Sequence, residues 1–361
     1  RQNSLAFEAS KMEQQQARER LTLDVILAYL QILSNEDLLH QAGLRVQLSQ
    51  QQVQRLETLN KQGAVSPSEL YDLKGQLAQD EVSVINTRNA LKASRLKLAQ
   101  LMNVEYNDSL RIARLSEDKL QLSGKYPHAA SEIYTSAIRQ LALVKATALR
   151  KESAEKGVQV ARAGGAPQLS FSSNLFSNYS SLATRNFLNG SQEVTTDNYI
   201  DVNGTRYPVI ATERNMSSRK IQLGDQLKNN YSSSFSLNLR IPIFNSLQTK
   251  TRIAQARVEL KNAELIESST QLELKQAVDQ AFFNMQAAWE RFEALNRQTE
   301  AFRQAFRAAE VRFNAGGGNA VDYSVAKNNF DQASIDLINA RYDYILRTKI
   351  LDYYRGELEI R

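Results

Sequence analysis

Val84-Ile85-Asn86-Thr87-Arg88 returns 253 residues later as Leu337-Ile338-Asn339-Ala340-Arg341. The match runs in register, without a gap, over about 85 residues, which is too long for the stacked repeats of a solenoid. The sequence therefore predicts one architecture that is built from two copies of the same helical hairpin. Other pairs at the same spacing are Leu21 and Leu274, Val25 and Val278, Ala28 and Ala281, Glu57 and Glu310, Gly63 and Gly316, and Leu98 and Leu351.

The composition is that of a folded chain in which long helices dominate. Hydrophobic residues make up 42% and charged residues 23% of the 361 positions, and there are only 14 glycines and 5 prolines. The net charge of +6 is spread along the chain without a basic block, which argues against nucleic-acid binding. No stretch approaches the apolar length of a transmembrane helix, and the lack of cysteine excludes thiol chemistry.

The first hairpin is expected to cover residues 1–103. Residues 5–62 contain no proline and are rich in Gln, Leu, Ala, Arg and Glu, which favours one helix of roughly 85 Å. Gly63 can end that helix in the left-handed conformation, so residues 63–66 are the expected turn.

The second helix of this hairpin begins with a recognisable start signal. Ser66 is the expected N-cap, Pro67 suits the first turn and Glu69 completes a capping box. We expect the helix to extend to about Met102.

Apolar residues at a seven-residue spacing indicate how this helix packs. Such a row predicts coiled-coil-like contact with a partner helix, and a second row (Ala78, Ile85, Ala99) lets the helix contact a neighbour on each side. An ordinary antiparallel bundle has a similar pattern and is an alternative. The main row is Leu70, Leu77, Val84, Leu91 and Leu98, matched by Tyr323, Phe330, Leu337, Tyr344 and Leu351 in the second copy.

The second repeat follows a stretch of mixed composition. Residues 104–128 are expected to form a small lateral connection, and residues 129–166 one helix that ends at Gly164-Gly165-Ala166-Pro167. The second hairpin is expected over 247–361, with a long helix of roughly 100 Å, a turn at 315–319 and a partner helix from Ala320 to Arg355.

Between these helical parts, residues 167–246 change to a period of two. From Tyr231 to Ile243 apolar residues alternate with polar ones, which predicts a strand with one apolar and one polar face. The sequence shows no second sheet that could pack on the apolar face, so we expect this face to contact lipid. That face holds Phe235, Leu237, Leu239 and Ile241. The intervening residues 179–230 are polar and contain an Asn203-Gly204 turn, which predicts a small hairpin.

Several short segments join these elements in a characteristic order. They are Val160-Ala161-Arg162 with Pro167-Gln168-Leu169, Ile241-Pro242-Ile243-Phe244, Val321-Asp322 after Gly316, and Ala340-Arg341-Tyr342-Asp343-Tyr344. Together with the duplicated hairpins and the alternating strand, they resemble the TolC-type outer-membrane efflux channel family over essentially the whole chain. The resemblance implies a mainly α fold with membrane β structure: long antiparallel hairpins form an α-barrel tunnel, and strands enter a trimeric transmembrane β-barrel. It also implies that residues 179–230 are an extracellular loop.

The same resemblance implies the function and the partners. We expect a homotrimeric passive duct in a tripartite efflux or type I secretion system, which exports drugs, small molecules or proteins. It would lie in the outer membrane, in contact with lipid, and extend into the periplasm to a periplasmic adaptor protein and, indirectly, an inner-membrane pump. The family's module also implies a further helix and two strands before Arg1.

The resemblance assigns the pore constriction to Asp322 and Glu69. A ring of carboxylates would attract cations and repel anions. The alternative for Asp322 is an acid that interacts with a helix N-terminus. Val325 stands where some members have a second aspartate, and Phe313 and Gly318 replace a tyrosine and an arginine that lock the mouth, so the lock is expected to differ.

The family receives its adaptor at the hairpin turns, here Gly63, Ala64, Val65, Gly316 and Gly317. The glycines are also suited simply to ending helices. His40 and His128 have no metal-spaced partner, and no catalytic arrangement or phosphate loop is present, so we expect no enzyme, metal or cofactor. Two alternatives to a channel are a soluble coiled-coil scaffold or membrane-remodelling protein, and an enzyme on a helical bundle.

Overall fold

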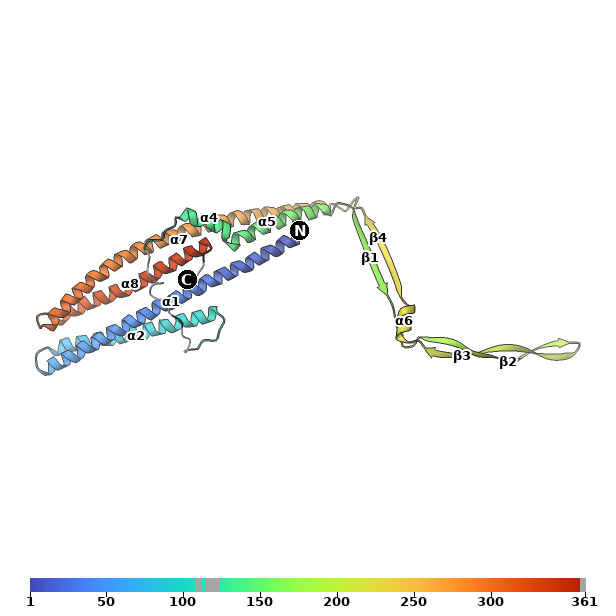
Figure 1. Ribbon diagram of the computed structural model, residues 1–361, viewed down its shortest axis with the longest axis horizontal. Coiled ribbons are helices and arrows are strands. Elements are labelled where there is room, and N and C mark those ends of the chain that lie inside the picture. Colours follow the sequence, from blue (N-terminus) through green and yellow to red (C-terminus); the bar gives the residue numbers. More distant parts are fainter. Residues whose placement is uncertain (108–111, 114–123, 358–361) are drawn as a thin grey trace. The chain divides into compact units, whose positions relative to one another are not determined.

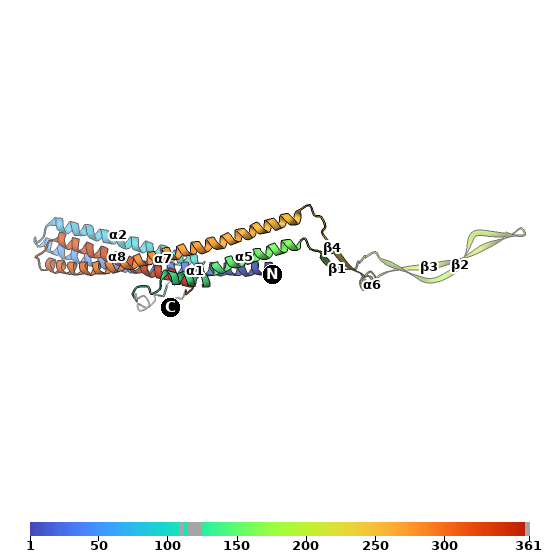
Figure 2. The same ribbon diagram turned by 90° about the horizontal axis from the view of Figure 1, so that it is seen from above.

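The computed structural model describes residues 1–107, 112–113 and 124–357. The chain divides into two compact units, which are described separately: Arg1–Val160 with Arg252–Arg361, and Ala161–Thr251. Figures 1 and 2 show the helices of the first unit and the strands of the second in two views.

The first unit is built from two long antiparallel hairpins. Helices α1 (Gln2–Lys61) and α2 (Pro67–Leu101) form one, and α7 (Gln248–Asn314) and α8 (Ala320–Arg355) form the other. At 1.5 Å per residue, the 60 residues of α1 and the 67 of α7 give lengths of about 90 and 100 Å. The predicted duplication of one hairpin is therefore present in the fold.

The predicted helix over 129–166 is wrong in one respect, because it is two helices. Helix α4 (Ala130–Gln140) and α5 (Ala142–Ala163) are separated at Leu141, whose backbone is extended (φ −64°, ψ 131°). Leu141 is only 3% exposed. Ile133 of α4 and Val144 of α5, on either side of the break, enter the same core.

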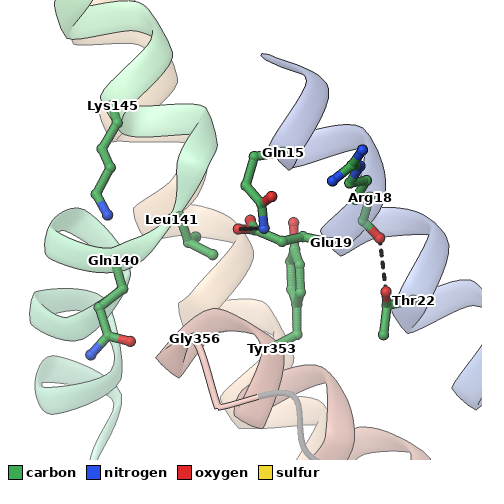
Figure 3. Close-up of a pocket in the computed structure, with 9 residues that line it drawn as sticks. All are labelled: Gln15, Arg18, Glu19, Thr22, Gln140, Leu141, Lys145, Tyr353 and Gly356. Atoms are coloured by element: carbon green, nitrogen blue, oxygen red, sulfur yellow. Dashed lines mark hydrogen bonds between the residues drawn. The ribbon is translucent and has the colours of Figure 1, made fainter. Parts of the chain in front are cut away.

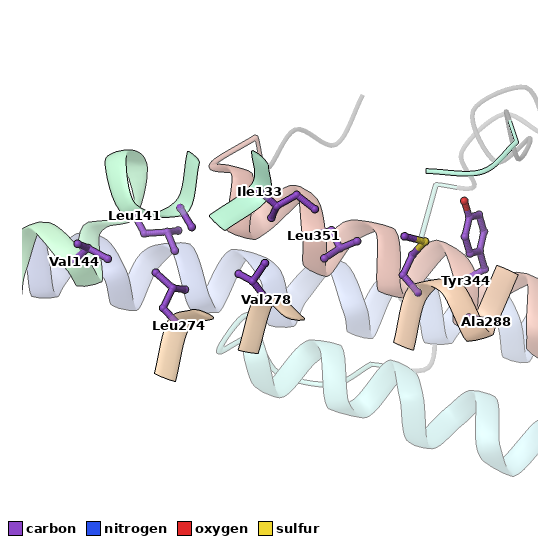
Figure 4. Close-up of a cluster of buried hydrophobic side chains, with 10 residues drawn as sticks. Ile133, Leu141, Val144, Leu274, Val278, Ala288, Tyr344 and Leu351 are labelled. Atoms are coloured by element: carbon purple, nitrogen blue, oxygen red, sulfur yellow. The ribbon is translucent and has the colours of Figure 1, made fainter. Parts of the chain in front are cut away.

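That core lies where α4 and α5 meet the second hairpin (Figure 4). Leu274 and Val278 of α7, and Tyr344 and Leu351 of α8, pack with Ile133. The packing ties the segment before the strands to the helices that follow them in sequence.

The seven-spaced apolar row of α2 faces its neighbours as predicted. Leu70, Leu91 and Leu98 are at most 8% exposed, and Leu91 and Leu98 pack on Ile32 of α1. In the second row Ala99 is buried, whereas Ile85 is 54% exposed. Of the predicted connection at 104–128, residues 108–111 and 114–123 lie outside the described residues.

The second unit consists of two antiparallel strand pairs and a short helix. Strand β1 (Gln168–Phe176) pairs with β4 (Ser232–Arg240), and β2 (Thr184–Val202) pairs with β3 (Thr205–Lys220); α6 (Leu223–Asn229) lies between β3 and β4 in the chain. The hairpin predicted at Asn203-Gly204 turns there, with φ of 54° and 82°. It is much longer than predicted, because apolar and polar residues do not alternate along β2 and β3, as the adjacent pairs Phe187-Leu188 and Val209-Ile210 show.

Candidate functional site

Both hairpin tips are closed by the same backbone motif. Gly63 (φ 70°) and Gly316 (φ 76°) adopt the left-handed conformation that lets the chain leave a helix at a C-terminal cap. In each tip the residue after this glycine donates its backbone N–H to a carbonyl five residues earlier. The N···O distances are 2.9 Å from Ala64 to Leu59 and 3.0 Å from Gly317 to Arg312.

The two predicted constriction acids occupy equivalent places just after these turns. The Glu69 backbone N–H donates to Ser66 Oγ at 3.3 Å, and the Asp322 backbone N–H donates to Asn319 Oδ1 at 2.7 Å. Glu69 is half-buried and Asp322 is exposed. Both carboxylates thus stand in the first turn of a helix, where the backbone dipole favours negative charge.

The predicted docking residues and lock positions gather at the same end of the first unit. Phe313 stacks on Tyr323 with ring centroids 5.0 Å apart, and it packs against the apolar cluster of Val53, Leu56, Leu70 and Leu73 at the first tip. Arg55 of α1 donates to the side-chain oxygen of Asn314 and, at 2.8 Å, to its backbone carbonyl. Arg55 and Asn314 therefore join the two tips, a contact that sequence reasoning missed.

A buried group of charges joins the hairpins farther along the helices. Asp80 of α2 and Lys327 of α8 have side chains that are 0% and 1% exposed, and Lys327 Nζ lies 3.1 Å from Asp80 Oδ2 and 2.8 Å from Asp331 Oδ2. Arg45 of α1 lies 2.8 Å from Asp80 and 3.1 Å from Asp331. Ser49 donates to Asp80 at 2.6 Å. Two cations and two anions therefore balance inside the helical unit.

This charge network controls the ionisation of Asp80. Burial alone would raise its pKa, but the hydrogen bond from Ser49 and the charges of Lys327 and Arg45 outweigh burial. The pKa of Asp80 therefore lies below its ordinary value of 3.8. Sequence reasoning missed this network because its charges look like those of a solvated helix surface.

The strand pair of β1 and β4 separates apolar from polar side chains. Phe235, Leu237 and Leu239 are 63–67% exposed on one face, where Phe171 stacks on Phe235 at 6.3 Å between ring centroids. On the opposite face Ser172 and Ser236 share a hydrogen bond of 2.7 Å. The prediction that Ile241 belongs to the strand face is wrong in its boundary, since β4 ends at Arg240. Pro242 has no N–H with which to extend the ladder.

The described residues hold no obvious chemical centre. A cavity of about 450 Å³ lies between α1, α4, α5 and the end of α8, where Arg18, Glu19 and Lys145 mix charges around Tyr353 (Figure 3). These side chains include no nucleophile with an adjacent base. Within the described ranges, no cluster of three or more metal-ligating side chains occurs. Likewise, no helix there has the length and hydropathy to cross a bilayer.

Comparison with solved structures gives the same fold. The chain superposes on a membrane protein from Pseudomonas aeruginosa (TM-score 0.72, 16% identity, covering 99% of this chain and 71% of that one). It is similar to the outer membrane protein VceC of Vibrio cholerae, with a TM-score of 0.71 and 15% identity, covering 98% of this chain and 74% of VceC. It is also similar to the open state of the outer membrane channel MtrE of Neisseria gonorrhoeae, with a TM-score of 0.71 and 17% identity, covering 99% of this chain and 70% of MtrE. No protein of curated function matches the chain.

The family follows from a sequence match. The model of the outer membrane efflux protein family matches residues 133–352, which is more than half of the chain. The chain therefore belongs to the outer membrane efflux protein family, and the TolC-type fold predicted from the sequence is confirmed. It is thus an outer-membrane channel protein of efflux systems, in a family of channels rather than enzymes. This membership favours the channel over the scaffold and enzyme alternatives.

Proposed function

We propose that three copies of this chain form a passive duct that crosses the outer membrane and extends into the periplasm. The strand pair of β1 and β4 is the observation that carries this proposal. Its apolar face is exposed, and in the described chain each of these strands pairs only with the other. Lipid tolerates no unpaired strand edge, so a membrane-spanning sheet must close on further strands into a barrel. Symmetric copies would supply those strands.

The hairpin tips are the proposed periplasmic mouth. In a threefold ring, Asp322 would give three carboxylates around one axis, with Glu69 beside it in the equivalent position of the first hairpin. Such a ring favours cations over anions. The equivalent backbone geometry of the two tips supports this assignment, because it gives the two acids the same relation to their turns.

A periplasmic adaptor is the proposed partner at the turns. The residues at the turns are small, and all but the half-buried Val65 are exposed. They are Gly63, Ala64, Val65, Gly316 and Gly317. Helical hairpins of an adaptor could approach this backbone closely. An inner-membrane pump would then act through the adaptor, and the cargo class, whether drugs, other small molecules or proteins, would be set mainly by the pump.

Reconstitution tests the proposal. The full-length protein, extracted with detergent and added to a planar bilayer, should produce conductance steps of one uniform size, and the pore should prefer cations. A protein that extracts without detergent and gives no steps would overturn the proposal and favour the scaffold.

A further inference from the structure

The base of the β2/β3 hairpin brings two arginines together on one face. Arg185 and Arg219 are directly opposed across the strands, and their guanidinium carbons lie 5.7 and 5.6 Å from the centroid of the Phe187 ring. Like charges in directly opposed positions destabilise a strand pair. In the described part of the chain, neither arginine forms an ion pair with a carboxylate. An anion from outside the chain would offset the repulsion between the two exposed guanidinium groups.

Charge is segregated along the same hairpin. The base, residues 177–190 with 215–230, carries Arg185, Arg219, Lys220 and Lys228 against Asp225, a net charge of +3. The distal part, residues 191–214, has a net charge of −2. Its charged residues are Glu193, Asp197, Asp201, Arg206, Glu213 and Arg214. The positive charge is thus concentrated next to the β1/β4 pair.

Exposed apolar side chains lie in the two links that join the hairpin to β1 and β4, and we call them the apolar collar. The collar consists of Tyr179, Leu182, Leu223 and Leu227, which are 53%, 84%, 53% and 43% exposed. Gln226, only 3% exposed, holds the links together. Its Oε1 accepts from the Ser180 N–H at 2.8 Å, and its Nε2 donates to the carbonyls of Ser180 and Ile221 at 2.9 and 2.8 Å.

We propose that the base of this hairpin binds the phosphate groups of anionic lipid in the outer leaflet, a proposal that rests on the membrane-spanning function above. Along the chain, the apolar face of β1 and β4 is followed by the apolar collar, then by the positively charged base of the hairpin, and then by its negatively charged distal part. Hydrocarbon, interface, phosphates and water follow in the same order at a membrane surface. Paired guanidinium groups suit a phosphate because each donates two parallel hydrogen bonds. The acidic distal strands are repelled by the same phosphates and stay in water.

Lipid binding by the full-length protein in neutral detergent tests this inference. Diphosphorylated lipid A is titrated in, and bound lipid is counted by native mass spectrometry. The double variant Arg185→Gln/Arg219→Gln should bind about 30-fold more weakly. Arg206→Gln/Arg214→Gln, which removes the same charge from the distal part of the same hairpin, should bind as the wild type does. Arg185→Lys/Arg219→Lys keeps the charge and should stay within about fivefold of wild type.

Two further arms identify the source of the phosphate. In the first arm, wild type is given lipid A without phosphates, and the affinity should be no higher than that of Arg185→Gln/Arg219→Gln for the diphosphorylated lipid. In the second arm, inorganic phosphate is added to wild type with bound diphosphorylated lipid A, and it should not displace the lipid. Displacement by inorganic phosphate, equal losses in both Gln double variants, or unaltered binding in Arg185→Gln/Arg219→Gln would each overturn the inference. In bilayers of neutral lipid, all variants should still conduct. If the wild type does not conduct, the proposed channel is contradicted, and the lipid-binding measurement still tests the phosphate site on its own.

Discussion

Lys327 Nζ of the second hairpin lies 3.1 Å from Asp80 Oδ2 of the first, and both side chains are almost fully buried. The duplication places Lys74 in the first hairpin where Lys327 stands in the second, and Ala333 where Asp80 stands. Lys74 pairs instead with Glu57 in its own hairpin, at 2.8 Å and with both side chains about 40% exposed. The two copies have therefore diverged at these positions, and one lysine now joins hairpin to hairpin.

Replacing this lysine should destabilise the helical unit strongly. Lys327→Met leaves Asp80 and Asp331 buried with only Arg45 to balance them, and breaking such a buried network costs about 3–5 kcal/mol. The free energy of unfolding can be measured by denaturant titration of the full-length protein in detergent.

The matched control is Lys74→Met, which removes the duplicate lysine from an exposed pair. Solvent screens that pair, so its loss should leave the unfolding midpoint unchanged. Equal destabilisation by the two substitutions would show that the buried network has no special role in stability.

The stabilising contribution of the buried network should be lost at low pH. Because the folded-state pKa of Asp80 is lowered, its stabilising contribution is fully present above the ordinary value of 3.8 and is lost as the pH falls through the lower folded-state value. Wild type should therefore lose stability relative to Asp80→Asn in this acid window. Parallel pH curves for the two proteins would show that Asp80 does not carry this dependence.

The role of Asp322 can be separated from helix capping. Asp322→Asn removes the carboxylate but keeps the backbone N–H that donates to Asn319. If Asp322 lines the constriction, the variant should lose cation preference and cation block in planar bilayers. An unchanged pore, with a stability loss of about 0.3–1 kcal/mol, would assign Asp322 to the helix dipole instead.

Neighbouring residues of β4 should differ in their tolerance of charge. Leu237 lies on the apolar face opposite Phe171, and Asn238 on the polar face opposite Ser170. Leu237→Arg puts a charge against hydrocarbon and should cost about 2–4 kcal/mol near the bilayer midplane. Asn238→Arg should assemble normally. The yield of heat-resistant oligomer in outer-membrane fractions measures the difference, and equal yields would contradict the face assignment.

Sequence periodicity predicted the elements whose packing repeats and missed those that break the pattern. The tips were predictable because Gly63 and Gly316 mark helix ends by their conformational freedom. The break at the buried Leu141 contains no proline or glycine, so the sequence carries no signal for it. The buried network could not be found from the duplication, because Asp80 and Asp331 have alanines as their counterparts. A lysine in a helix gives no sign of burial until its partners on other helices are placed.

Electron microscopy of the intact protein in detergent tests the central claim most directly. We predict threefold particles with a hollow axis that is continuous through the helical part. A uniform population of monomers without a central channel, stable in buffer without detergent, would contradict the account.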